Sequence, residues 1–285
     1  MAYRVIIVPV LGESADSAAL ACTRAITERA RGHIVGLHVR NPISMVMTGG
    51  MFEGAYMSPD LINGLEESGR SRAAAARDVF RQWQQACGIE SASAPDQAKI
   101  TAEWVELEAP VAAEIGRRGR TADLVVLARS ARDFTTTTDE ALQGALFDSG
   151  RPVLIVPGSQ TVNLVDTVVI AWNDSREAAH AVAAAWSLIG HAKRIVVFVG
   201  GNDEGMRRSA DRLVTHLAWR GYAAATVIGD ASGDVGDGLL TVAQREKAGL
   251  IVMGAYTHSR LRQIVFGGAT SHILKNTTIP VLMAH

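Results

Sequence analysis

The sequence has no excess of basic charge. Its 285 residues include 28 Lys or Arg and 29 Asp or Glu, which gives a formal net charge of -1. Proteins that bind nucleic acid need a basic surface to displace counterions from the phosphates. The charge balance therefore excludes nucleic acid as an expected partner.

Long apolar runs are also missing. No run reaches the roughly 18 apolar residues that a membrane-spanning helix requires. The N-terminal residues 1–4 lead directly into a strand-like run that ends at Val10, without the basic, apolar and small-residue regions of a secretory signal. The sequence accordingly predicts a cytoplasmic protein with no membrane partner.

Cysteine is scarce, and the other reactive residue types form no recognised pattern. Cys22 and Cys87 are too few for a disulfide framework or, by themselves, for a zinc site. The 8 histidines include no His-Glu-x-x-His pair, and no serine stands in a Gly-x-Ser-x-Gly elbow. The sequence therefore predicts no metal site and no catalytic residue.

What the chain does contain is an alternation of short apolar runs with longer helical patterns. Strands are predicted at 4–10, 33–39, 100–105, 123–128, 153–156, 167–172, 194–199, 223–228, 250–253 and 280–283. Helices are predicted at 14–31, 61–86, 111–118, 139–147, 175–189, 204–219, 238–246 and 269–275. Strands that are apolar throughout are typical of a parallel sheet with helices on both faces. The alternation indicates a doubly wound α/β fold.

The two halves of the chain resemble each other. Residues 122–127 are similar to 248–253, and residues 152–156 are similar to 280–283. The repeat is far longer than that of a solenoid protein. The sequence thus predicts a duplicated domain, with copies at 1–158 and 166–285 joined by a polar segment.

The most informative segment is a glycine loop that runs from Gly254 to Thr270 between a predicted strand and a predicted helix. Gly267 and Gly268 stand at the helix start, where free backbone N–H groups and the helix dipole favour an anion. His258 and Arg260 add donors and charge. The spacing is neither that of a Walker A loop nor that of the dinucleotide fingerprint.

This loop resembles the signature of the universal stress protein family, which reads glycine, two residues, glycine, nine residues, glycine and then serine or threonine. Gly254 and Gly267 match the signature. Thr257 replaces its second glycine, and Gly268 replaces its final hydroxyl residue. Residues 168–175 are similar to the family's first strand and its Asp-Gly-Ser turn. In that turn, Asn173 stands where the family has an aspartate that contacts the nucleotide.

The resemblance covers nearly the whole chain as two tandem copies. It implies two Rossmann-like doubly wound domains, each with a five-stranded parallel sheet, packed as a pseudo-dimer within one chain. In the family, single domains pair through their last strands, which correspond here to 153–156 and 281–283. The resemblance also implies a stress-response protein that binds an adenine nucleotide, with ATP favoured and ATP hydrolysis slow or absent. Mg²⁺ would accompany the phosphates, although no carboxylate is clearly placed to hold it.

The resemblance implies a nucleotide site in the second copy. Val199 and Met253 would offer backbone groups around the adenine, and the glycine loop would hold the ribose and phosphates. The implied residues are Asn173, Val199, Met253, Gly254, Thr257, His258, Arg260, Gly267, Gly268, Ala269 and Thr270.

The first copy is predicted to contain a degenerate nucleotide site. Counting back from the shared proline places Asp139 and Glu140 where the second copy has Gly267 and Gly268. Two carboxylates at a helix start satisfy its dipole from within the chain and repel an incoming phosphate. We therefore predict that only the second copy binds a nucleotide.

Two further segments leave alternatives open. Residues 41–64 are rich in methionine, which favours either a lid over the first domain or a contact with a protein partner, a second copy of the chain or an apolar ligand. On that basis the alternative function is a nucleotide-free protein-interaction module. Residues 230–241 superficially resemble a calcium loop, but Val235 and Thr241 stand where glycine and glutamate are required. They predict a helix-capping loop instead.

Overall fold

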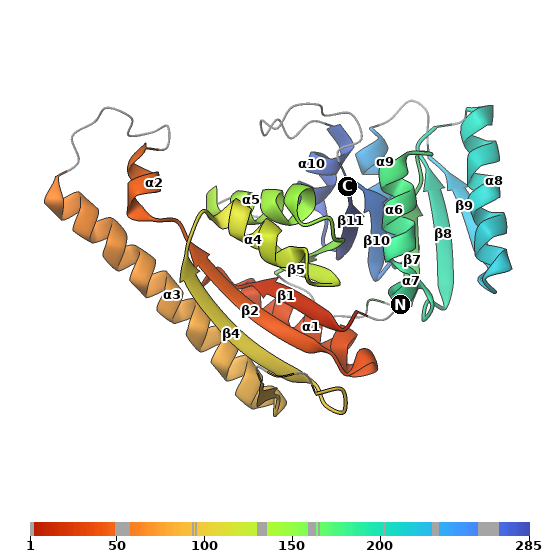
Figure 1. The fold of residues 1–285 in the computed structure, drawn as a ribbon. Coiled ribbons are helices and arrows are strands. Elements are labelled where there is room, and N and C mark those ends of the chain that lie inside the picture. Colours follow the sequence, from red (N-terminus) through yellow and green to blue (C-terminus); the bar gives the residue numbers. More distant parts are fainter. Residues whose placement is uncertain are drawn as a thin grey trace. The chain divides into compact units, whose positions relative to one another are not determined.

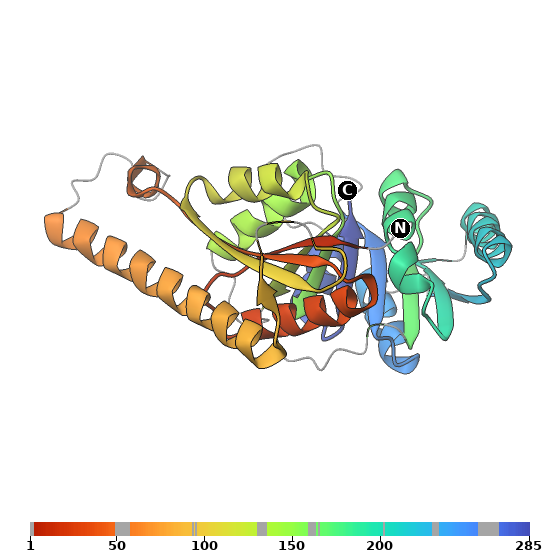
Figure 2. The same cartoon turned by 60° about the horizontal axis from the view of Figure 1, so that its bottom comes forward.

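The computed structural model describes residues 3–48, 58–92, 94, 96–129, 136–158, 164, 166–201, 203–229, 234–255 and 268–285. The chain forms two compact units, 3–151 and 152–285. Each unit is an α/β layer structure in which helices cover both faces of its strands (Figure 1 and Figure 2).

The unit 3–151 contains parallel strands. Their order is β3 (Glu90–Ser91), β4 (Thr101–Glu108), β2 (His33–Arg40), β1 (Val5–Pro9) and β5 (Leu124–Arg129). One face is covered by α1 (Asp16–Ala30) and α3 (Pro59–Cys87), and the other by α4 (Val111–Gly119) and α5 (Thr136–Gln143) (Figure 2). A short helix α2 (Ile43–Thr48) precedes α3, and a π-helical turn η1 (Gly144–Asp148) follows α5.

The unit 152–285 contains one antiparallel strand beside a parallel set. The order is β6 (Val153–Pro157), β11 (Val281–Ala284), β10 (Leu250–Gly254), β7 (Thr167–Ala171), β8 (Arg194–Val199) and β9 (Ala224–Ile228). Strands β11, β10, β7, β8 and β9 are parallel to one another, whereas β6 is antiparallel to β11. α6 (Arg176–Ala184) and α8 (Glu204–Trp219) lie on one face, and α9 (Val235–Arg245) and α10 (Gly268–Asn276) on the other (Figure 1). The one-turn helix α7 (Trp186–Ile189) follows α6.

The sequence forms these elements for simple reasons. Strands β5, β6 and β11 are buried at every position, as expected for apolar strands that lie between two helical layers. Several helices begin at residues whose side chains cap free N–H groups. Ser175 caps α6, Asp203 caps α8 and Asp234 caps α9.

The predicted fold class is confirmed. Every predicted strand and helix is present, and the structure adds the short elements β3 and α2. The predicted pairing of the two last strands is confirmed as well, because Ile155 lies opposite Val281 and Val153 opposite Met283 in the β6–β11 pair.

The division into units differs from the expected one at a single strand. We predicted that β6 ends the first domain, but the chain passes from one compact unit to the other between Arg151 and Pro152. The hydrogen bonds of β6 with β11 group it with the unit 152–285. Among the described residues, that unit therefore contains one strand more than the expected five, and the unit 3–151 contains β3 in addition to four longer strands.

Among the described residues, none of the helices combines the length and the apolar character needed to cross a bilayer.

Candidate functional site

The strand order of the unit 152–285 creates one topological switch point. From β7 the chain moves through β8 to β9 on one side, whereas β10 and β11 lie on the other side. Open α/β sheets bind ligands outside the carboxyl ends of the strands at such a point. Met253 of β10 is paired with Ala171 of β7, so the two strand ends lie side by side. The segments that leave them begin at Trp172 and Ala255.

The turn after β7 is organised by Asn173. Its Oδ1 atom accepts hydrogen bonds from the Ser175 hydroxyl at 2.7 Å and from the Ser175 N–H at 3.3 Å. The Ser175 hydroxyl in turn accepts from the N–H of Ala178 at 3.1 Å and caps α6. Between them, Asp174 has φ 58°, a left-handed conformation that aspartate tolerates better than most residues. This polar turn lies at the predicted ligand position.

Gly254 ends β10 beside the first turn of α6. A Cβ atom on this glycine would lie 2.6 Å from the Ala178 nitrogen and 2.7 Å from the Glu177 carbonyl carbon. The absence of a side chain thus allows α6 to approach the strand end. We predicted that Gly254 serves the approach of a ligand; the structure gives a packing reason that holds without one.

The two residues predicted to lie around the adenine are buried strand ends. Val199 is fully buried, and its carbonyl oxygen accepts a hydrogen bond from the N–H of Gly229 at 2.8 Å. A carbonyl oxygen has two lone pairs, so this bond leaves acceptor capacity. Met253 is 6% exposed.

The helix predicted to receive the phosphates begins where the sequence indicates. α10 starts at Gly268, followed by half-buried Ala269 and buried Thr270. Four other predicted site residues, namely Thr257, His258, Arg260 and Gly267, lie outside the described residues.

The turn after β1 in the unit 3–151 corresponds to the turn after β7. The N–H of Val10 donates to Leu37 at 2.9 Å, as the N–H of Trp172 donates to Phe198 at 2.9 Å. Gly12, with φ 81°, then corresponds to Asp174. Buried Leu11 accordingly stands where the second unit has Asn173. Sequence reasoning missed this difference because the two turns have no identical residue at corresponding positions.

In the same turn an internal carboxylate uses the backbone donors. Oδ2 of Asp16 accepts from the N–H groups of Leu11 at 3.1 Å, Gly12 at 2.8 Å and Glu13 at 2.9 Å. Burial raises the pKa of Asp16 to about 6, against the opposing effect of these hydrogen bonds. Backbone N–H groups that are clustered in this way bind anions, and here the anion belongs to the chain itself.

The carboxylates predicted to block the first site lie differently from each other. α5 begins at Thr136, so Asp139 stands in its first turn, as expected. Burial raises the pKa of Asp139, and the nearby Arg129 charge acts in the opposite direction. Glu140 lies beyond the first turn. Its Oε2 atom accepts from Nδ2 of Asn41 at 2.8 Å, so Glu140 links α5 to the segment after β2 instead of facing the helix start.

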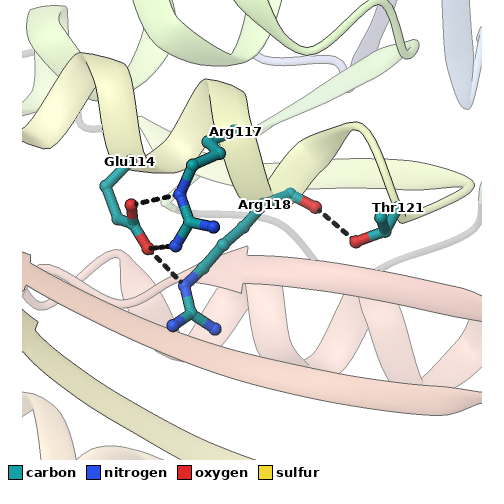
Figure 3. Close-up of polar contacts among 4 residues, drawn as sticks. All are labelled: Glu114, Arg117, Arg118 and Thr121. Carbon is teal, nitrogen blue, oxygen red and sulfur yellow. Dashed lines mark hydrogen bonds and ion pairs between the residues drawn. The ribbon is translucent and has the colours of Figure 1, made fainter.

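A separate cluster of charged residues on α4 is structural (Figure 3). Glu114 is 7% exposed and accepts hydrogen bonds from Arg117 at 2.8 and 2.6 Å and from Arg118 at 2.6 Å. These bonds, chiefly those from Arg117, lower the pKa of Glu114. Because the three residues are neighbours on one helix face, the cluster ties successive turns of α4 together.

The methionine-rich segment 41–64 is helical at both of its ends. α2 follows residue 42, and α3 begins at Pro59 with Ser58 as its cap. Met45 and Leu61 are 45% and 44% exposed. Residues 49–57, which include Met51 and Met57, lie outside the described part of the chain.

Comparison with known proteins identifies relatives of this fold. The model of the universal stress protein family matches residues 199–285. Among solved structures, a universal stress protein from Archaeoglobus fulgidus DSM 4304 is 17% identical, with a TM-score of 0.71 over 98% of this chain and 97% of its own. A protein of unknown function from Pseudomonas aeruginosa PAO1 is 16% identical, with a TM-score of 0.56 over 99% and 92%. No curated protein matches the chain.

The two solved structures are matched over nearly their full lengths, so they show that the whole chain has their fold. The family match adds a sequence signal to the C-terminal residues, which contain α10, β10 and the end of β8. The universal stress protein family match therefore covers residues 199–285, and the likeness of the whole chain to the two solved structures is a likeness of fold.

Proposed function

We propose that this protein binds an adenine nucleotide, with ATP favoured, at the strand ends of the unit 152–285. In this proposal it acts as a stress-response sensor or regulator and not as an efficient enzyme. The observation that carries the proposal is the juxtaposition of the β7 and β10 carboxyl ends, with the Asn173 turn leaving one and the glycine loop leaving the other.

The chemistry of these segments supports a nucleotide. Asn173 and the backbone at Val199 and Met253 supply neutral hydrogen-bonding groups, which suit a base and a ribose. The start of α10 supplies free N–H groups and a positive dipole end, which suit phosphates. The proposed site includes the predicted residues Thr257, His258, Arg260 and Gly267 as phosphate or ribose contacts. Mg²⁺ is proposed only as a companion of the phosphates.

The first experiment is mass spectrometry of small molecules released by denaturing the purified protein, followed by calorimetric titration of the emptied protein with ATP, ADP and AMP. We expect a released adenine nucleotide or saturable binding. A protein that releases none and ignores all three nucleotides would overturn the proposal. It would favour the alternative of a protein-interaction module, for which the exposed Met45 and Leu61 are the supporting observation.

Substitutions at Asn173 make the test specific. Asn173→Asp keeps an oxygen acceptor for Ser175 and should keep binding. Asn173→Leu places in this turn the residue found at the corresponding position of the other unit, and should weaken binding by about tenfold or more. Gly267→Asp should abolish binding by placing a carboxylate at the phosphates. Unchanged affinity in folded Asn173→Leu and Gly267→Asp proteins would show that the ligand binds elsewhere.

A further inference from the structure

Three potential metal ligands meet where α9 and α10 lie together. Asp234 and Asp237 come from the start of α9, and His272 comes from α10. One carboxylate oxygen of each aspartate and one imidazole nitrogen all lie within 4.8 Å of one another. Sequence reasoning treated the first two residues only as part of a helix-capping loop and did not consider His272.

Asp234 does cap α9, and its carboxylate can still bind a metal ion. Oδ1 of Asp234 accepts from the N–H groups of Gly236 at 2.7 Å and Asp237 at 3.2 Å. An ionised carboxylate has two oxygens and about four acceptor positions. Cap and metal ligand are therefore compatible roles for Asp234.

The imidazole is held close to the carboxylate without an aligned hydrogen bond. Nε2 of His272 lies 2.7 Å from Oδ1 of Asp237. This nitrogen is inaccessible to water, yet its geometry satisfies no hydrogen bond among the described residues. Two ligand atoms that are close together but not directed at each other can share a third, positively charged centre. This observation is independent of the acidic character of the helix start.

Gly236 makes the arrangement possible. A Cβ atom at this position would lie 2.9 Å from Cδ2 of His272 and 2.9 Å from Oδ1 of Asp234. The glycine therefore lets the imidazole ring lie against the first turn of α9, beside both carboxylates. Gly236 is thus a second feature of the sequence that allows the three potential ligands to lie together.

We propose that Asp234, Asp237 and His272 bind a divalent transition-metal ion of the Zn²⁺ class. The imidazole favours such ions over Mg²⁺ and Ca²⁺, which prefer oxygen ligands alone. Three protein ligands leave at least one coordination position for water. The proposed metal site needs no nucleotide, so metal binding can be tested independently of the proposed nucleotide binding.

The test uses the untagged full-length protein, stripped with a chelator and free of nucleotide. Titration with Zn²⁺ and Co²⁺ should show one ion per chain, with no competition from Mg²⁺. The Co²⁺ complex should show d–d absorption without intense thiolate bands, which excludes Cys22 and Cys87 as ligands. Thiolate bands, or no saturable binding up to about 1 mM metal, would overturn the proposal.

Variants locate the ion. Asp234→Asn keeps the helix cap, because asparagine caps as well as aspartate, but removes the charged ligand. Asp234→Asn, Asp237→Asn and His272→Gln should each weaken Co²⁺ affinity by about tenfold or more. His180→Gln on α6 and Asp211→Asn on α8 are exposed matched controls and should bind as the natural protein does. Unchanged affinity in the three site variants, or loss in His258→Gln instead, would assign the metal elsewhere.

Discussion

At the residue scale, Asp16 shows how the chain satisfies an anion site internally. Its Oδ2 atom accepts hydrogen bonds from three backbone N–H groups, and its buried Oδ1 atom has no hydrogen-bond partner among the residues that the structure describes. Burial outweighs the hydrogen bonds and raises its pKa from 3.8 to about 6. The folded protein therefore holds a proton on Asp16 at pH values where the unfolded chain has released it.

The sign of the resulting pH dependence follows from linkage. A raised pKa contributes stability that is fully present below the unfolded value near pH 4 and is lost as the pH rises through about 6. We expect the stability of Asp16→Asn, which cannot ionise, to rise by about 2 kcal/mol relative to that of the natural protein between pH 4 and pH 7. Urea unfolding at several pH values measures this difference. A difference that stays constant across the range would contradict the assignment.

Asp174 allows a second prediction at this scale, because its φ of 58° favours glycine. Asp174→Gly should change the free energy of unfolding by less than about 0.5 kcal/mol, whereas Asp174→Val should lower it by about 1–2 kcal/mol. Asp174 also lies 3.6 Å from Arg212 in an exposed ion pair. Arg212→Ala is the control that separates the lost pair from the backbone effect. Equal stability of the Asp174→Gly and Asp174→Val proteins would show that the left-handed backbone at residue 174 does not affect stability.

At the element scale, Gly254 tests whether a signature glycine serves packing. Gly254→Ala would push α6 away from β10, and we expect a loss of about 1–3 kcal/mol in the nucleotide-free protein. Gly64 of α3, with nothing within 4 Å of an added Cβ atom, is the matched control. Gly64→Ala should instead gain about 0.5–1 kcal/mol from helix propensity. If Gly254→Ala is neutral without ligand and harmful only to binding, the glycine serves the ligand.

The elements themselves were readily predicted from the sequence. The observed bounds of α8 equal the predicted range 204–219, because its apolar stripe repeats at the helical period and Asp203 caps it. β3 was missed because two exposed residues carry no periodic signal. The partner of β6 could not be predicted by periodicity either, since an apolar strand fits any buried sheet position equally well.

The site was predicted less completely than the fold. Asn173 was predicted as a candidate because its turn resembles a family motif, and its counterpart Leu11 was missed because only the matching backbone hydrogen bonds reveal the correspondence. The contact of His272 with Asp237 was missed because the two residues are far apart in the sequence. Local pattern predicts elements, whereas side chains that meet between elements depend on tertiary packing.

At the scale of the whole molecule, the β6–β11 pair ties the end of the first sequence repeat to the second. Leu154 lies opposite Leu282 in this antiparallel pair. Directly opposite residues have Cβ atoms close enough for a disulfide bond. We expect Leu154→Cys with Leu282→Cys to form an intrachain disulfide on oxidation in a Cys87→Ser background. Leu154→Cys with Val281→Cys should not, because neighbouring strand residues point to opposite faces. Non-reducing electrophoresis of a protease digest distinguishes the two results.

The difference between the two β–α turns also sets an expectation for the whole chain. If the polar turn at Asn173 is needed for a nucleotide, the unit 3–151 cannot bind one, because Leu11 replaces the polar residue and Asp16 already uses the backbone donors. Calorimetric titration should therefore give one nucleotide per chain. Leu11→Asn should leave this ratio unchanged, because Asp16 still holds the N–H groups, and Asn173→Leu should remove the binding signal. Two nucleotides per chain in the natural protein would show that neither Leu11 nor Asp16 closes the first unit to ligand.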